Sequence, residues 1–438
     1  MNPRQLAFTT LRSIQKGAFA DVAVDQALHQ FDLNSLDRRL FTELVYGTVR
    51  RQRTLNELID QFAKKKDQPP DLRLILQLGL YQLRYLDQIP ESAAVDTTVE
   101  LAKKNKLSGL TGVVNGILRQ YLRSQLILHS DPLKLPDDAI EQLGMLHSYP
   151  DWIVQVWFDQ FGREDTAKLC EWMNQPPRID LHINTLKTTL EQVESAIPGS
   201  QQIPTVPNAL RLPNNPGAIQ NLPGYSEGWW IVQDSSAQLV SYLVDPQPGE
   251  IVADACAAPG GKTMHLAELM QDQGTVWAID KTPSRLKKLQ QNLDRLNLTS
   301  IQILTRDSRN VPDLKGKCDR VLVDAPCSGL GTLNRHADAR WRQTPESTIE
   351  LAQIQQEILS EAASWVKPQG ILVYSTCTLN PIENEAVIEK FLAQNQNWTI
   401  ERSTQPVLIS LTSQQGWIKV LPHCHNMDGF FMVRLKKI

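Results

Sequence analysis

The sequence has few of the features that mark membrane, secreted or nucleic-acid-coating proteins. Its six cysteines include no Cys-x-x-Cys pair, which argues against the disulfide framework of small secreted domains. No apolar run is long enough to span a bilayer, and the first residues lack the apolar stretch of a secretory signal. The net charge of −3 argues against a histone-like coat of positive charge. We therefore expect a cytoplasmic protein without membrane contact.

The length and the distribution of charge indicate several domains. The 438 residues exceed what one small core needs, which predicts roughly two to four domains. Residues 1–123 contain 18 basic and 13 acidic residues, although the whole chain is slightly acidic. This excess fits contact with nucleic acid, and a solvated helical surface explains it equally well. Basic clusters at 50–53, 64–66 and 103–106 could likewise hold phosphates or complement helix C-termini.

The first two expected domains differ in their hydrophobic spacing. Helical spacing predicts an all-α domain over residues 1–130, and residues 72–81 are apolar nearly all round, as in a buried central helix. A linker-like stretch follows, and then a small α+β module over residues 145–235 whose β-α-β pattern suits a ferredoxin-like or RNA-recognition-like (RRM-like) fold. Four tryptophans of this module could stack RNA bases but suit core packing better: Trp152, Trp157, Trp229 and Trp230.

Residues 236–438 alternate between short apolar strands and helical stretches. This pattern predicts an α/β domain with a doubly wound, mostly parallel sheet, which binds ligands beyond the carboxyl ends of its strands. The expected strands include 251–255, 276–280, 301–305, 320–324 and 371–375. Polar or reactive side chains fall at or just past these ends: Asp254, Asp280, Asp307, Asp324 and Cys377. The sequence therefore predicts a binding site along this edge.

A turn rich in small residues follows the first of these strands. Small residues let the backbone approach a ligand at the start of a helix, and the expected contacts are Cys256, Ala257, Ala258, Pro259, Gly260, Gly261 and Lys262. Asp280 ends the next strand, where an acid can bind both hydroxyls of a ribose, and Asp307 could accept from an adenine amino group. These residues predict an adenosyl ligand, either a dinucleotide or S-adenosylmethionine.

The same turn is close to a P-loop, which would instead bind a nucleoside triphosphate. Gly261-Lys262-Thr263 matches the end of that motif, but Cys256 stands where its first glycine is required. Pro259 also removes a backbone N–H from the phosphate cradle. An NTPase is therefore the weaker interpretation.

Two cysteines follow apolar strands in turn sequence, Cys327 within residues 323–329 and Cys377 within residues 374–378. Each could be a small buried hydrophobe, which is the commoner role of cysteine. Their positions beyond the ends of neighbouring strands favour instead two thiols that face one cleft. Because a thiolate is a strong soft nucleophile, the pair predicts covalent chemistry on an electrophilic ring such as cytosine.

These motifs together resemble those of a known family. Residues 254–263, 324–329 and 375–385 are similar to the corresponding segments of the RNA cytosine-5 methyltransferases, and residues 1–125 resemble the NusB-type helical domain. The combination, which covers nearly the whole chain, is that of the Sun/Fmu/RsmB type, which modifies a cytosine in 16S-type ribosomal RNA. One departure is the segment 334–338, Asn-Arg-His-Ala-Asp, where that type often has Arg-Arg-His-Pro-Asp.

The resemblance implies a mechanism and its participants. The cofactor would be S-adenosylmethionine, the partner small-subunit ribosomal RNA, and the third domain Rossmann-like with a seven-stranded sheet. Cys377 would attack C6 of the cytosine, and Cys327 would help to release the product. Asp324 would bind the N3/N4 edge of the base and line the cofactor site, and Lys262 would assist electrostatically. The target base must leave its stack to react.

Some alternatives remain open at this point. A non-catalytic RNA-binding protein of the same fold would need neither Cys327 nor Cys377. The basic, aromatic segment 335–342 could contact RNA or form a surface loop and the start of a helix. His423-Cys424-His425 lacks a second ligand pair, so we expect no metal site. We also expect a monomer.

Overall fold

The computed structural model describes residues 2–65, 67–214 and 216–438, which form two compact units. Unit 1 contains residues 1–175 together with 333–342, and unit 2 contains residues 176–332 and 343–438. Lys66, in the second of the basic clusters, lies outside the described residues. No helix of the described chain is long and apolar enough to cross a membrane. The boundaries of the three expected domains stay predictions.

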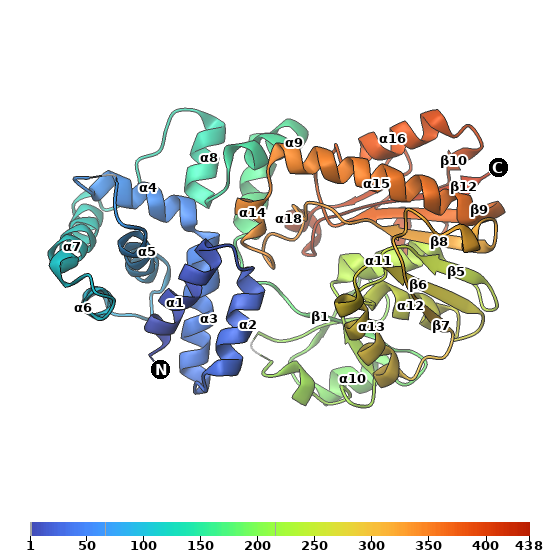
Figure 1. Cartoon of the computed structure of the whole chain (residues 1–438), viewed down its shortest axis with the longest axis horizontal. Coiled ribbons are helices and arrows are strands. Elements are labelled where there is room, and N and C mark those ends of the chain that lie inside the picture. Colours follow the sequence, from blue (N-terminus) through green and yellow to red (C-terminus); the bar gives the residue numbers. More distant parts are fainter. Residues whose placement is uncertain (1, 66, 215) are drawn as a thin grey trace. The chain divides into compact units, whose positions relative to one another are not determined.

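Unit 1 is all-helical, as the hydrophobic spacing predicts (Figure 1). Its helices are α1 (Pro3–Gln15), α2 (Ala20–Gln30), α3 (Ser35–Arg50), α4 (Gln52–Phe62), α5 (Pro70–Tyr85), α6 (Glu91–Lys104), α7 (Thr111–Leu128), α8 (Ala139–His147), α9 (Asp151–Trp172) and, from the later segment, α14 (Ala339–Arg342). Local sequence sets several of the starts: the Asn34 side chain caps α3 by accepting from the Asp37 N–H at 2.9 Å, and Pro70 occupies the first turn of α5, where no N–H is needed.

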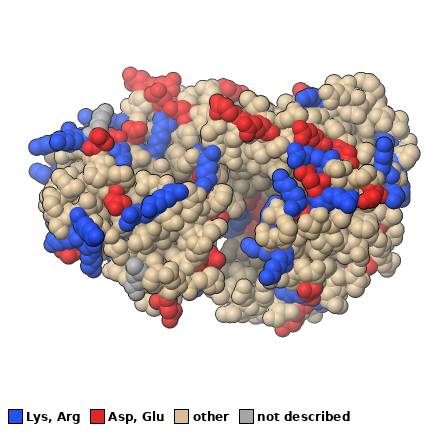
Figure 2. Space-filling view, in the orientation of Figure 1, with Lys and Arg blue, Asp and Glu red and all other residues tan. Residues whose placement is uncertain are grey.

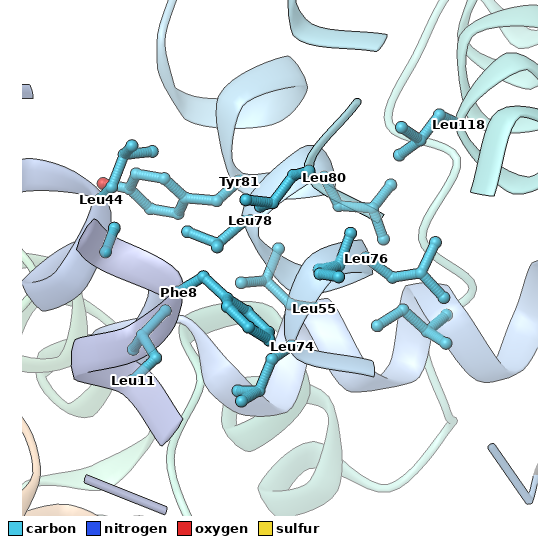
Figure 3. Packing of buried hydrophobic residues seen from close by; sticks show 14 of the residues in the cluster. Phe8, Leu11, Leu44, Leu55, Leu74, Leu76, Leu78, Leu80, Tyr81 and Leu118 are labelled. Atoms are coloured by element: carbon cyan, nitrogen blue, oxygen red, sulfur yellow. The ribbon is translucent and has the colours of Figure 1, made fainter. Parts of the chain in front are cut away.

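The predicted central helix of unit 1 is α5. Residues 74–82 of this helix are all buried, and the surrounding helices pack against it on several sides (Figure 3). Helix α3 approaches it very closely, because a Cβ placed at Gly47 would lie 2.0 Å from the Tyr81 ring. Only glycine fits at this crossing, so a side chain at position 47 would push the two helices apart.

The segment 333–342 is built into unit 1. Arg340 is fully buried, and its guanidinium donates to the carbonyls of Arg50, Ser148 and Leu333 and to the Asn174 side chain. Trp341 Nε1 donates to a carbonyl of α3 at 2.7 Å. Burial lowers the pKa of Arg340 to about 10. The expectation of RNA contact or a surface loop is therefore wrong for Arg340, whose donors are used inside the helical unit.

Unit 2 begins with a small antiparallel sheet. Its elements are β1 (Asp180–Ile183), α10 (Leu190–Ala196), β2 (Gln201–Gln202), β3 (Ala209–Arg211) and β4 (Trp230–Val232), with the strand order β2-β3-β1-β4. This is the expected small α+β arrangement. Trp230 is fully buried there, as Trp157 is in unit 1, so these two tryptophans belong to cores rather than to base-stacking surfaces.

The rest of unit 2 is a mixed, mostly parallel sheet between helices. The strands are β5 (Ile251–Asp254), β6 (Thr275–Asp280), β7 (Ile301–Thr305), β8 (Cys318–Asp324), β9 (Val366–Thr376), β10 (Trp398–Ile400), β11 (Ile418–Val420) and β12 (Phe430–Lys437). Seven of them form the path β10-β12-β9-β8-β5-β6-β7, parallel from β9 to β7, and β11 adds an eighth beside β12. The predicted Rossmann-like fold is confirmed.

Helices cover both faces of this sheet (Figure 1). They are α11 (Ser235–Val244), α12 (Gly261–Leu269), α13 (Pro283–Leu296), α15 (Pro345–Trp365) and α16 (Glu385–Gln394), with short helices α17 (Pro406–Ile409) and α18 (Pro422–His425) near the end. Adjacent strand residues alternate between two apolar cores, Val252 with α11–α13 and Ala253 with α15 and α16. This double burial leaves the carboxyl ends of the strands as the edge where polar side chains gather.

Figure 2 shows how charge is distributed over one face of the molecule. Lysine and arginine side chains lie there in several separate groups, with acidic groups between them. This pattern fits the nearly neutral composition of the chain.

Candidate active site

The small-residue turn connects β5 to α12. Gly260 adopts φ +110°, a left-handed conformation that favours glycine, and a Cβ there would lie 2.9 Å from Leu289. Asp254, which ends β5, is buried and accepts from Thr263 Oγ1 at 2.7 Å. Burial raises the pKa of this carboxyl to about 7. Asp254 therefore fixes the end of the turn through its hydrogen bond with Thr263, and residues of the turn line two neighbouring cavities.

One of these cavities has a volume of about 260 Å³ and lies beyond the strand ends. It is lined by Cys256 and Ala258 of the turn and by the carboxylates of Asp280, Asp307 and Asp324. The other, of about 190 Å³, borders the turn from Cys256 to Pro259, with Gly261, Lys262 and Asp324. The structure thus brings the turn and the aspartates expected for the cofactor together, with Gly260 beneath as the cap of α12.

The aspartates of the larger cavity differ in their partners. Asp280 is buried, accepts from the Thr282 N–H at 2.8 Å and lies 3.3 Å from the Arg285 guanidinium. Asp307 is partly exposed, and its hydrogen bonds from Arg309 lower its pKa to about 2. Asp307 therefore keeps a negative charge at the cavity wall throughout the neutral range.

Lys262 and Asp324 form a partly buried ion pair with 2.7 Å between Nζ and Oδ2. Ser375 Oγ donates to the other oxygen of Asp324 at 2.8 Å, and Lys262 Nζ lies 4.9 Å from the centre of the Phe430 ring. Burial by itself lowers the pKa of Lys262, but the Asp324 charge outweighs it and the net shift is upward. A P-loop lysine must be free to reach phosphates, so this pairing also disfavours the NTPase interpretation.

The two predicted thiols meet. Cys327 Sγ and Cys377 Sγ are 3.3 Å apart, and both cysteines line the same cavity as Asp280 and Asp324. The hydrogen bond to Cys377 and then burial raise the pKa of Cys327 well above its usual range. Cys327 is therefore a thiol that keeps its proton at neutral pH.

The remaining cysteines have other environments. Cys170 and Cys318 are buried in cores, and burial raises the pKa of each to about 12. Burial also raises the pKa of Cys256 well above its usual range. Cys424 is exposed. Within residues 2–65, 67–214 and 216–438, no group of three or more His, Cys, Asp or Glu side chains is arranged to hold a metal ion.

Glu383 joins the two cysteine loops, and sequence reasoning gave it no role. Its Oε1 accepts from the Ser328 N–H at 2.8 Å and from Gln355 Nε2 at 3.1 Å. Its Oε2 accepts from the hydroxyls of Ser328 and, at 3.4 Å, Thr378. Ser328 follows Cys327 and Thr378 follows Cys377, so one buried carboxylate holds the residue after each thiol. The only sequence signal was its place in the motif 380–385.

Burial raises the pKa of Glu383, and its hydrogen bonds only partly oppose this shift. The neighbouring Asn384 strengthens the same connection, because it accepts from Thr376 Oγ1 at 2.5 Å and donates to the Thr378 carbonyl at 3.0 Å. The loop that contains Cys377 is thus fixed on both sides of the cysteine, which gives its sulfur a defined position.

Three family models match successive parts of the chain. The 16S rRNA methyltransferase RsmB/F model matches residues 241–436, the NusB family model residues 1–123, and the RsmF/B-like ferredoxin-like domain model residues 149–217. Along the chain, the NusB match comes first, the ferredoxin-like match second and the methyltransferase match last, which is the expected order.

Individual relatives match over the full length. The probable ribosomal RNA small subunit methyltransferase B of Synechocystis sp. is 49% identical over 451 residues, which span 100% of both chains. Among solved structures, PH0851 is similar with a TM-score of 0.81, 26% identity and coverage of 100% of this chain and 99% of that one. The NSun6 structure from Pyrococcus horikoshii, solved with SFG, has a TM-score of 0.59 and 22% identity over 67% of this chain and 99% of its own.

Proposed function

The chain belongs to the RsmB/F family of 16S ribosomal RNA methyltransferases, and from this we propose that it methylates C5 of a cytosine in small-subunit ribosomal RNA through a covalent cysteine adduct. The observation that carries the proposal is the contact of Cys327 and Cys377, 3.3 Å apart, in one cavity with Asp280 and Asp324. Binding RNA alone requires no pair of thiols beside a cofactor cavity.

S-adenosylmethionine is the methyl donor of this methyltransferase, and the donor set of the cavity fits it. The cofactor has a cationic sulfonium and a ribose, and the cavity offers three carboxylates and the backbone of a small-residue turn. Asp280 would hold the ribose hydroxyls, and Asp307 would accept from the adenine amino group. When bound, the cofactor supplies an electrophilic methyl group.

The chain's own residues must make the ring reactive, because C5 of cytosine is too weak a nucleophile by itself. In the proposed mechanism the Cys377 thiolate adds to C6, which makes the C4–C5–C6 unit an enamine and C5 nucleophilic. After the methyl group has bonded to C5, a water molecule in the cavity accepts the C5 proton, and the C5–H electron pair forms the C5–C6 double bond. The C6–S bond breaks in the same step, so the Cys377 sulfur departs as a thiolate and the aromatic ring is restored.

The environments of the two thiols support a division of roles. The raised pKa of Cys327 keeps it protonated, which suits a group that assists product release rather than one that attacks. The Lys262 ammonium is close enough to Cys377 to interact electrostatically with its sulfur, and a positive charge favours a thiolate there. This charge supports Cys377 as the nucleophile.

Asp324 would select cytosine at the same site. A carboxylate can accept from the N4 amino group of cytosine and also from N3 when N3 carries a proton, whereas uracil presents a carbonyl oxygen at position 4 that cannot donate. Lys262 and Ser375 hold the two oxygens of this carboxylate in place. The pairing fixes the orientation of the group that would recognise the base.

The direct test uses the full chain, S-adenosylmethionine with a tritiated methyl group, and unmodified small-subunit ribosomal RNA made by transcription. After digestion to nucleosides, we expect the radioactivity to elute with 5-methylcytidine. Cys377→Ala should abolish incorporation, whereas Cys424→Ala, at an exposed cysteine, serves as the matched control and should retain it. Label in another nucleoside, or full activity of Cys377→Ala, would contradict the proposal.

A further inference from the structure

The helical unit contains a further cavity that the proposed reaction does not use. It has a volume of about 320 Å³ and is formed by helices α1, α3, α4 and α5 together with residues of the segment 338–342. All of its walls belong to unit 1. Its volume falls at the lower end of the range of about 300–1,000 Å³ that is typical of small-ligand pockets.

Apolar and aromatic side chains make up much of the lining. Leu11, Ile14, Val49 and Leu74 contribute aliphatic surface, and Trp341 contributes an indole. The Trp341 N–H already donates to the Val49 carbonyl at 2.7 Å, so the indole offers ring surface rather than a hydrogen bond. Such a lining favours a flat apolar body as the ligand.

The charged groups of the lining are already neutralised. Arg73 lies 2.7 Å from Asp60 and also donates to Asn56. Arg342 lies 2.9 Å from Asp338 and donates to the Gly17 and Ala18 carbonyls. A phosphate would have to compete with these carboxylates for the guanidinium groups, so the cavity is poorly suited to a strongly anionic ligand.

Neutral polar groups are what remain available. Thr48 is 1% exposed, and its hydroxyl has no hydrogen-bond partner among the described residues. The Gln52 amide likewise makes no hydrogen bond with the part of the chain that the structure describes. A buried hydroxyl without a partner loses about 1–3 kcal/mol, which a ligand that bonds to it would recover. Together these groups offer both donors and acceptors without charge.

We propose that this cavity takes one unstacked nucleobase of the RNA substrate. A base is flat, largely apolar on its faces and neutral at its edges. Those edges carry donors and acceptors that can pair with the Thr48 hydroxyl and the Gln52 amide. Single-stranded RNA segments are recognised in this way, with splayed bases placed against aromatic rings and bonded at their edges. The inference rests on the proposed function for the identity of the ligand, since that function makes RNA the substrate.

The first experiment measures the affinity of the full chain for unmodified small-subunit ribosomal RNA by filter binding. The variants are Thr48→Val, which removes the unpartnered hydroxyl at nearly constant shape, and Gln52→Ala; Gln125→Ala, an exposed glutamine of α7 outside the cavity, is the matched control. We expect Kd to rise about five- to tenfold for each cavity variant, as for one lost hydrogen bond, and to stay constant for the control.

Stability distinguishes binding from a structural role. Thr48→Val should raise the melting temperature, because it removes a buried polar atom without a partner, while it weakens RNA binding. A purely structural role would move both properties in the same direction. Unchanged Kd for both Thr48→Val and Gln52→Ala would overturn the proposal.

The position of the base is tested by crosslinking the same RNA to the wild-type chain with ultraviolet light, followed by mass spectrometry. Crosslinked peptides should contain Trp341 or residues 48–56, and crosslinks confined to other peptides would overturn the site.

The cavity proposal and the proposed reaction can fail independently of each other. If the chain methylates cytosine but Kd responds to neither Thr48→Val nor Gln52→Ala, the cavity proposal fails alone. If Kd responds but no cytosine is labelled, the cavity stands and the proposed reaction fails.

Discussion

Replacing Glu383 tests whether one carboxylate positions both thiols. Glu383→Ala removes the acceptor for the buried Ser328 N–H and one of two acceptors of Gln355 Nε2, which keeps its hydrogen bond to the Pro326 carbonyl at 2.9 Å. A buried donor left without a partner costs about 1–3 kcal/mol and one lost hydrogen bond about 0.5–1.5 kcal/mol, so we expect Glu383→Ala to lower the free energy of unfolding by about 2–4 kcal/mol. It should also release the loops that follow Cys327 and Cys377.

Glu383→Gln is the matched control, because it keeps the shape and one carbonyl oxygen. That oxygen can still accept from the Ser328 N–H and from Gln355, and the hydroxyls of Ser328 and Thr378 can rotate to accept from the new amide. The loss should therefore be about 1 kcal/mol or less, measured by urea unfolding of the full chain. Methyl transfer should fall strongly in the alanine variant and be largely retained in the glutamine variant.

A second measurement separates positioning from bulk stability. The pKa of Cys327 is raised by the hydrogen bond to Cys377, by burial and by the charges of neighbours that include Glu383. Glu383→Gln removes that last charge, so the pKa of Cys327 should fall and the pH profile of its alkylation by iodoacetamide should move to lower pH. Equal destabilisation by alanine and glutamine, or an unmoved alkylation profile, would refute the reasoning.

Three further predictions concern the cofactor and the reaction. Cys327→Ala should accumulate a covalent RNA–protein complex on denaturing gels while Cys377→Ala does not, and equal trapping by both would reverse or abolish the roles assigned to them. Asp280→Asn should weaken S-adenosylmethionine binding at least tenfold in calorimetry, because the ribose hydroxyls lose a charged acceptor; an unchanged Kd would remove Asp280 from the site. The folded-state pKa of Asp254, raised by burial to about 7, means that its stabilisation is complete below about pH 4 and is lost as the pH rises through 7. Melting temperatures from pH 5 to 8 should therefore fall more for the wild type than for Asp254→Asn, and parallel curves would contradict this.

The sequence predicted those parts of the fold that depend on local patterns. The strands of the parallel sheet lie where short apolar runs alternate with helical stretches. In the small α+β module, strands β1, β3 and β4 lie at the segments for which the sequence predicted strands. The meeting of Cys327 and Cys377 followed from topology, because adjacent parallel strands β8 and β9 bring their carboxyl ends to one edge. These inferences needed only periodicity and chain order.

What the sequence could not reveal depends on partners far along the chain. Arg340 lies in a basic, polar segment with every local sign of a surface loop, yet its acceptors come from Arg50, Ser148 and Asn174. Glu383 likewise bonds a residue 55 positions earlier. Charged residues are seldom fully buried, and the burial of these two depends on hydrogen-bond partners that mostly lie far away along the chain.

The placement of residues 333–342 within unit 1 has a consequence for the order in which the protein folds during its synthesis. About 160 residues separate Gln175 from Leu333, and at roughly 5–20 residues per second the ribosome needs on the order of ten to thirty seconds to make them. Throughout that interval the nascent helices lack the buried Arg340 side chain and the Trp341 indole, and the carbonyls of Arg50 and Ser148 lack their donor. The helical unit is the first to be translated, yet it is completed only after the strands β5 to β8 of the large sheet have been synthesised.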